Sequence, residues 1–199
     1  MERQKLSIYD RAQAEHGCTP QGFMWHSAAV AQIYYQVTLM VTKWSGQSCL
    51  EVGCGAGSMW EYVCEKGYDM DYEGIDINQS AILEAKKKYT DRNFYSGDIL
   101  TFLPLKSYEF CLAAGAFNIK NDHVEDHQAY LRAVIEKMFT ICKKGMAISF
   151  KTLLSDEGKA RGYMAYDPVD ILDYALTLSR FANLNHAFSD GFAVLYLYK

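Results

Sequence analysis

The feature that most constrains the fold is a regular alternation of short apolar runs with segments of helical periodicity. The apolar runs predict strands at 47–53, 70–77, 92–98, 108–116 and 145–150, and the periodic segments predict helices at 58–66, 79–89, 124–142 and 168–181. Alternation of this kind favours parallel strands joined by right-handed crossovers, with helices covering both faces of one sheet. The run 108–116 is apolar enough to be a central strand, and ligands of such sheets bind at the carboxyl ends of the strands.

The two ends of the chain extend this pattern. Two helices are expected before the first strand, and the second of them, at 26–44, overlaps the stretch 16–42, which has no Asp, Glu, Lys or Arg. Gln32 and Gln36 share one face of that helix, so we interpret it as a buried helix and not a membrane span. Near the other end, two β-like runs around Asp190-Gly191 predict an antiparallel hairpin, which brings the expected sheet to seven strands.

Composition limits the class of protein. A chain of 199 residues with three prolines and no linker is expected to form one domain, with 1–45 as a helical cover and 46–199 as the core. The net charge of −4 argues against a nucleic-acid partner. The six cysteines form no C-x-x-C pair and suggest neither zinc nor disulfides, and the first residues form no apolar signal region. We therefore expect a cytoplasmic protein without a metal.

The stretch "LEVGCGAGSMW" at 50–60 follows the first predicted strand and opens a helix, where Ser58 and Glu61 have the spacing of a capping box. A phosphate-binding loop of the G-x-x-x-x-G-K-[ST] type would need a lysine that is missing. A dinucleotide loop would need Gly or Ala where Ser58 stands. What remains is the pattern E-x-G-x-G-x-G, formed by Glu51, Gly53, Gly55 and Gly57.

That pattern resembles the first motif of class I S-adenosylmethionine-dependent methyltransferases, and three further stretches follow in the family's order: "EGIDIN" (73–78), "SGDIL" (96–100) and "AAGAFN" (113–118). The resemblance implies a Rossmann-like, seven-stranded, mostly parallel sheet with a C-terminal antiparallel hairpin and S-adenosylmethionine as cofactor. It also implies that Asp76 accepts hydrogen bonds from the ribose, that Asp98 meets the adenine amino group and that Ile99 packs on the ring. The cofactor-binding residues it implies are Glu51, Gly53, Cys54, Gly55, Gly57, Asp76, Ile77, Asp98, Ile99 and Ala114.

A second resemblance, to small stand-alone bacterial methyltransferases, covers "HGCTPQGFMW" (16–25), "AAGAFN" and "RGYMAYDP" (161–168). Methyl transfer is an in-line displacement that mainly requires positioning and exclusion of water, so a strong catalytic signature is not expected. The catalytic candidates are Asn118, Tyr163, Tyr166 and His26, with His123 as a further histidine, and Tyr9 and Trp25 are candidates for cofactor contact.

The sequence therefore predicts a methyltransferase for a small-molecule acceptor with a nitrogen or oxygen nucleophile. Asn118 near the expected methyl position, without an obvious strong base, favours nitrogen slightly. Two alternatives stay open: a lyase or cyclase that consumes S-adenosylmethionine and releases methylthioadenosine, and a non-catalytic partner subunit that binds the cofactor. The protein is expected to act as a monomer or homodimer, without nucleic acid and without a membrane.

Overall fold

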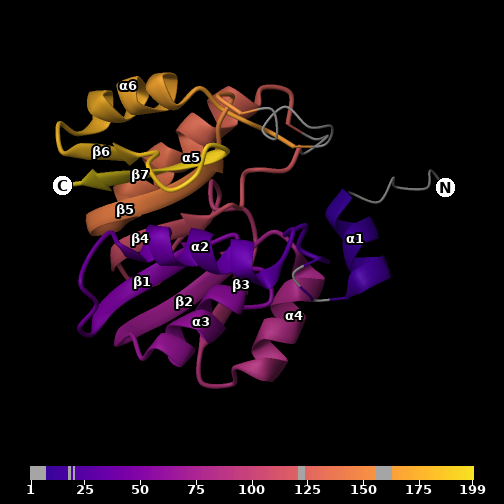
Figure 1. The fold of residues 1–199 in the computed structure, drawn as a ribbon. Helices are drawn as coiled ribbons and strands as arrows, with labels where there is room; N and C mark the ends of the chain where they lie inside the picture. Colours follow the sequence, from indigo (N-terminus) through magenta and orange to yellow (C-terminus); the bar gives the residue numbers. More distant parts are fainter. Residues whose placement is uncertain (1–7, 18, 20, 121–123, 156–162) are drawn as a thin grey trace.

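The fold is an α/β sheet flanked by helices, seen here in a computed structural model that describes residues 8–17, 19, 21–120, 124–155 and 163–199 (Figure 1). The strands are β1 (Gln47–Val52), β2 (Met70–Asp76), β3 (Asn93–Ser96), β4 (Tyr108–Ala114), β5 (Cys142–Lys151), β6 (Ala182–Asn185) and β7 (Phe192–Tyr198). The helices are α1 (Ile8–His16), α2 (Ala28–Leu39), α3 (Ser58–Lys66), α4 (Gln79–Lys88), α5 (His127–Ile141) and α6 (Pro168–Leu178).

The strand order is β3-β2-β1-β4-β5-β7-β6, which confirms the predicted seven-stranded, mostly parallel sheet. The first five strands pair in parallel, and β7 lies antiparallel between β5 and β6. The register pairs Val52 with Ile75 and Ala114 with Ser149, so the carboxyl ends of neighbouring parallel strands meet at one edge. Residues that follow these strands in the sequence are thereby brought together in space.

Two apolar layers hold the helices against the sheet. The core on one face includes side chains of α2, α3 and α4, and the core on the opposite face includes side chains of α5 and α6 (Figure 1). In α2, Tyr34, Val37 and Leu39 are buried, while Gln32 and Gln36 are exposed as expected. No helix among the described residues is long and apolar enough to cross a membrane. Because α2 packs on the sheet together with α3 and α4, only residues before α2 are candidates for the cover that was predicted at 1–45.

Several element boundaries differ from the predictions. The helix expected at 26–44 is confined to α2, because Ser27 caps its start by accepting a hydrogen bond from the amide of Val30, and the helix stops at Leu39. The helix expected at 168–181 starts as predicted, with Asp167 accepting from the amide of Val169, but it ends at Leu178. The strand expected at 145–150 extends from 142 to 151, since its apolar run pairs with both β4 and β7.

The predicted cap of α3 and the predicted turn of the C-terminal hairpin were both wrong. The capping box of Ser58 and Glu61 does not form, because Gly57 is the residue that precedes the helix, in a left-handed conformation with φ 82°, and Ser58 already lies inside α3. The C-terminal hairpin is present, but β6 lies earlier than expected and the connection to β7 covers 186–191. It is therefore a six-residue loop and not a tight turn at Asp190-Gly191.

Candidate active site

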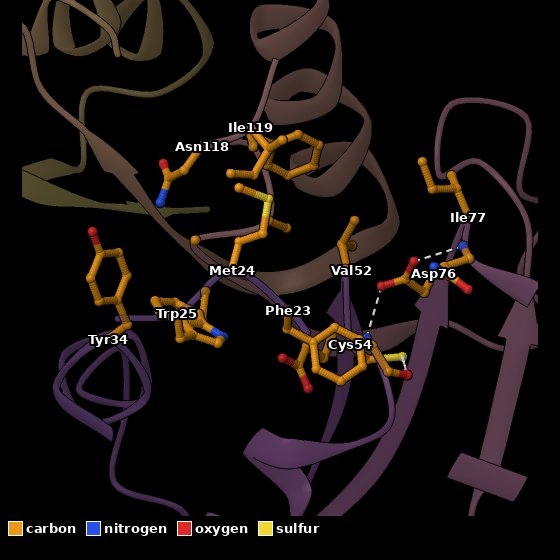
Figure 2. A pocket seen from close by; sticks show the side chains of 18 of the residues that line it. Phe23, Met24, Trp25, Tyr34, Val52, Cys54, Asp76, Ile77, Asn118 and Ile119 are labelled. Carbon is orange, nitrogen blue, oxygen red and sulfur yellow. Dashed lines mark hydrogen bonds between the residues drawn. The ribbon is translucent and has the colours of Figure 1, made fainter. Parts of the chain in front are cut away.

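A cavity of about 650 Å³ opens at the carboxyl ends of the parallel strands. Residues at or just after the carboxyl ends of β1, β2 and β3 line one part of it, which we call the acidic half because its carboxylates are those of Glu51, Asp76 and Asp98. Residues at or after the carboxyl ends of β4 and β5 line the other part. We call it the basic half because Lys120 and Lys151 belong to it. Phe23, Met24 and Trp25 cross the cavity between the two halves (Figure 2).

The glycine-rich loop forms the floor of the acidic half. Gly53 adopts φ 76°, and a Cβ atom there would lie 2.2 Å from the Cβ of Ala116, so only glycine fits between the β1 and β4 loops. The amides of Gly53 and Cys54 donate to the carbonyl of Ile75, at 2.8 and 3.2 Å. These amides thus fasten the loop to β2.

Asp76 lies where the sequence predicted it, at the end of β2 and facing the cavity. Its Oδ2 accepts from the amide of Gly55 and its Oδ1 accepts from the amide of Asn78, both at 2.8 Å (Figure 2). Burial raises the pKa of this carboxyl, while the backbone hydrogen bonds oppose the shift. Because an ionised carboxylate has about four acceptor positions, both oxygens can still accept a hydroxyl from a ligand.

Glu51 is the second carboxyl of the acidic half and is almost fully buried. Its Oε2 accepts a short hydrogen bond from the hydroxyl of Tyr72 on β2. Burial raises the pKa of Glu51 to about 8, and the Tyr72 hydrogen bond only partly offsets this effect. A ligand cation near Glu51 would stabilise the ionised form, so this position is suited to an ammonium group.

Asp98 and Ile99 complete the acidic half beyond β3. The Oδ1 of Asp98 accepts from the amide of Leu100 at 2.9 Å, and Asp98 is also hydrogen-bonded to Tyr130 of α5. Burial and the nearby Asp98 raise the pKa of Tyr130 to about 12, so its hydroxyl remains protonated. Ile99 is buried and Ile77 is exposed, and both line the cavity, so the acidic half also offers aliphatic contacts.

Asn118 lies in the basic half, just after β4, and is 5% exposed. Its Oδ1 accepts from the backbone amide of Lys151 at 2.7 Å, and its backbone carbonyl accepts from the amide of Met164 at 2.9 Å. The side chain therefore joins the ends of β4 and β5, and its Nδ2 group is the part that can donate to a ligand.

The two predicted tyrosines differ in their surroundings. The hydroxyl of Tyr166 donates to the carbonyl of Phe117 at 3.0 Å, and its buried ring packs edge-on against Phe150, so its contacts support the loop after β4. Tyr163 lines the cavity with its ring beneath the ammonium of Lys151, 4.5 Å from Nζ to the ring centroid. Both tyrosines line the cavity.

The remaining candidates lie on the N-terminal side of the cavity. His26 is exposed at the edge of the lining, and Trp25 packs edge-on against Tyr34, with ring centroids 4.8 Å apart. Tyr9 belongs to α1, but its side chain lies outside the described part of the structure, as does His123 altogether.

Of the predicted cofactor residues in the glycine loop, Gly57 does not line the cavity. A Cβ atom there would lie 2.8 Å from the ring of Tyr89, so its glycine serves packing beneath α3. The other residues of the set that the resemblance implied, which are Glu51, Gly53, Cys54, Gly55, Asp76, Ile77, Asp98, Ile99 and Ala114, all line the cavity. Within the described residues, no group of three potential metal ligands comes together.

Sequence reasoning missed several lining residues, among them Phe23, Tyr34, Tyr130 and Lys151. The three aromatic residues carry no signal, because tyrosine and phenylalanine are common packing residues in this chain. Lys151 could have been found, since it is a charged residue that ends the apolar run of β5, and this is the signal that identified Asp76 at the end of β2.

The fold and the cavity define the class of protein, and comparison with known proteins agrees with them. Residues 49–145 match the family model described as "Methyltransferase domain". The strand order with the antiparallel β7 is that of the Rossmann-like methyltransferase fold. Residues 49–145 therefore form a class I S-adenosylmethionine-dependent methyltransferase domain.

Individual relatives are distant. Rv1506c of Mycobacterium tuberculosis, named as a candidate methyltransferase, is 24% identical over 126 residues, which is 62% of this chain and 75% of the relative. CalS10 of Micromonospora echinaspora, an amino pentose methyltransferase, matches with a TM-score of 0.61 and 14% identity over 98% of this chain and 99% of its own. The [4+2]-cyclase SpnF matches with a TM-score of 0.65 and 12% identity, and the match covers 86% of this chain and 82% of SpnF. At such identities the two structures show a shared fold only.

Proposed function

We propose that this enzyme transfers the methyl group of S-adenosylmethionine to a small-molecule acceptor in the basic half of the cavity. The observation that carries the proposal is the division of one cavity of about 650 Å³ into two chemically different halves. A volume of this size lies within the range of roughly 300–1,000 Å³ that is typical of small-molecule sites. CalS10, which shares the fold, is named for an amino pentose acceptor, and this supports a small acceptor.

The donor groups of the acidic half fit the cofactor. S-adenosylmethionine supplies a methyl group activated by a sulfonium, and it also carries an ammonium, a ribose and an adenine. In our proposal Glu51 binds the ammonium, Asp76 the ribose hydroxyls and Asp98 the adenine amino group, with Ile77 and Ile99 on the faces of the ring. Gly53, Cys54 and Gly55 form the floor beneath the cofactor, because their amides are held by β2.

The basic half holds the acceptor in this proposal. Asn118 donates from Nδ2 to the acceptor, since its Oδ1 already accepts from the amide of Lys151. Trp25 and Tyr163 exclude water from the two sides, and Ala114 lies at the floor between the halves. His26, at the exposed edge, is the candidate for removing a proton from an acceptor that carries one.

Product analysis tests the proposal. The isolated chain would be incubated with S-adenosylmethionine and a mixture of small-molecule acceptors, and the nucleoside products would be separated by mass spectrometry. S-adenosylhomocysteine that forms only when acceptors are present supports methyl transfer. Methylthioadenosine would instead indicate cleavage or cyclisation of the cofactor. Absence of turnover, with cofactor binding retained, would indicate a subunit that only binds it.

A further inference from the structure

One polar atom of the cavity lining makes no hydrogen bond in the part of the chain that the structure describes. It is the Nε2 of Gln13, a residue of α1 that lines the cavity. This nitrogen has almost no contact with solvent, although its amide group carries two protons that can be donated. A buried donor without a partner is unfavourable, so its presence in a cavity wall calls for a ligand that accepts from it.

The orientation of the Gln13 amide follows from the start of α4. The Oδ1 of Asn78 caps that helix by accepting from the backbone amide of Ala81 at 3.0 Å, so the Nδ2 of Asn78 is the donor end of this side chain. That Nδ2 donates to the Oε1 of Gln13 at 3.0 Å, and the hydroxyl of Ser80 lies 3.2 Å from the same oxygen. Because Oε1 faces α4, Nε2 is the end of the Gln13 amide that is directed to another partner.

The same asparagine connects Gln13 to Asp76. The backbone amide of Asn78 donates to the Oδ1 of Asp76 at 2.8 Å, while its side chain donates to Gln13. The Gln13 amide and the Asp76 carboxyl are therefore each one hydrogen bond away from Asn78, and all three residues line the cavity. A group that accepts and a group that can donate thus lie in the same part of the acidic half.

This pair of groups matches a hydroxyl on the ligand. A hydroxyl has one proton to donate and two lone pairs that accept, whereas an ionised carboxylate only accepts. A hydroxyl that donates its proton to Asp76 therefore still needs a donor for its own oxygen once the ligand is shielded from water. The ribose of the cofactor carries two such hydroxyls, and the Nε2 of Gln13 is a donor that lacks an acceptor.

The helix that carries Gln13 lies beside the start of α4 (Figure 1). Of the α1 side chains that the structure describes, Arg11, Ala14, Glu15 and His16 are exposed, whereas Ala12 and Gln13 are half-buried. A hydrogen bond from Gln13 to a ligand would therefore strengthen the attachment of α1 to the rest of the molecule.

From these observations we infer that Gln13 is a specificity-determining residue of the cofactor site, which donates from Nε2 to the oxygen of a ribose hydroxyl that itself donates to Asp76. The inference rests on the proposed function, because it requires the ribose at Asp76. It adds a residue of α1 to a site that is otherwise built from the strand ends, and it makes the attachment of α1 depend on that hydroxyl.

Calorimetry with S-adenosylhomocysteine and its 2′-deoxy and 3′-deoxy analogues tests the inference. The native protein should bind at least one analogue about tenfold or more weakly than S-adenosylhomocysteine, because two hydrogen bonds are lost with the hydroxyl. Gln13→Met has a side chain of similar length that cannot donate. In this variant the preference for S-adenosylhomocysteine over that analogue should shrink by about threefold to tenfold, because only the bond to Asp76 is left to lose.

Gln36→Met is the matched control, since Gln36 of α2 is exposed and lies outside the cavity. It should leave all three affinities unchanged. A Gln13→Met variant that keeps both native preferences would overturn the inference, whether it binds the three ligands as the native protein does or binds all of them more weakly by one factor. The second pattern is what a purely structural role of Gln13 would produce.

A measurement on the native protein gives an independent check. Amide exchange in α1 should be slower with saturating S-adenosylhomocysteine than with the saturating analogue that lacks the recognised hydroxyl. Equal protection of α1 by all three ligands would also overturn the inference. The proposed function is tested separately by the nucleoside product, so a wrong role for Gln13 and a failure of methyl transfer give different results.

Discussion

The two halves of the cavity are built in different ways. In the acidic half, backbone features and the residues next to them in sequence create the site: a glycine loop, and a carboxylate at or just after each of three strands. In the basic half, side chains arrive from the N-terminal segment, the β4 loop, α5, the end of β5 and the segment at 163–166. In our proposal the cofactor is therefore bound mainly by residues close together in sequence, whereas the acceptor is bound by residues from several distant segments.

The largest effect is expected from Gly53→Ala, which breaks the acidic half at its floor. The added Cβ would lie 2.2 Å from the Cβ of Ala116, and this contact cannot be relieved by rotating a side chain. Calorimetry should show no binding of S-adenosylhomocysteine. Gly67→Ala is the control, because Gly67 also has a positive φ but has nothing within 4 Å of its Cβ position. If the two variants bind equally well, the floor does not depend on this contact.

The next effect is expected from Asp76→Asn, which sharpens the assignment of the acidic half. The change removes the charge from an acceptor of two backbone amides and, in our proposal, of the ribose hydroxyls. Affinity for S-adenosylhomocysteine should fall by on the order of 1–3 kcal/mol, measured by calorimetry. Asp71→Asn, on the same strand but exposed, should change little. Unchanged affinity in Asp76→Asn would remove this residue from the cofactor site.

A pH dependence should follow from Glu51. Burial raises its pKa to about 8, so below that pH the carboxyl is mostly protonated and cannot pair with the cofactor's ammonium. Affinity for S-adenosylhomocysteine should therefore rise with pH by up to about tenfold per unit and level off near the pKa of Glu51. Titration calorimetry over this range should show the slope in the native protein and no slope in Glu51→Gln. An equal slope in both proteins would assign the proton to another group.

The smallest effect is expected in the basic half, from Tyr166→Phe. The hydroxyl donates to the carbonyl of Phe117, so its loss should lower the free energy of unfolding by about 1 kcal/mol. Methyl transfer should be little changed, because this hydroxyl is used within the protein. Chemical denaturation and the transfer rate would be compared with Tyr174→Phe, whose hydroxyl bond to Glu136 is exposed. A large loss of rate with unchanged stability would restore Tyr166 as a catalytic candidate.

The contrast between the two halves also explains which features could be predicted from the sequence. The mostly parallel sheet was predicted from alternation, and residues such as Asp76 were named because their stretches resemble the motifs of the methyltransferase family. The start of α3 at Ser58 was predicted correctly, but its capping box was wrong, because Gly57 precedes the helix in a left-handed conformation and no propensity of Ser58 reveals this. The use of the Gly53 and Cys54 amides by Ile75 was equally hidden, since it depends on the register between β1 and β2.

In the basic half, prediction fell short for a different reason. Asn118 suggested a nitrogen acceptor, but its Oδ1 is used by the amide of Lys151, a contact across 33 positions of the chain. Lys151 itself was not singled out, although it lines the cavity. Contacts between segments so far apart in sequence follow from the packed fold, and a single sequence does not contain them.

The segments at 21–25 and 163–166 both line the cavity, but their backbone hydrogen bonds differ. This difference predicts which of them opens more easily. In the segment at 163–166, the amides of Met164 and Tyr166 donate to Asn118 and Lys151 at the sheet edge. In the crossing segment, the amides of Phe23 and Met24 donate only to Thr19 and Gln21 beside them, and Met24 has a positive φ of 60°.

Amide exchange should therefore be fast at 21–25 and slow at 164 and 166 before any ligand binds. When S-adenosylhomocysteine binds, protection should increase at 21–25 and change little at 164 and 166, as measured by mass spectrometry. Ligands would then enter and leave through local opening of the segment at 21–25, while the segment at 163–166 stays fixed to β4 and β5.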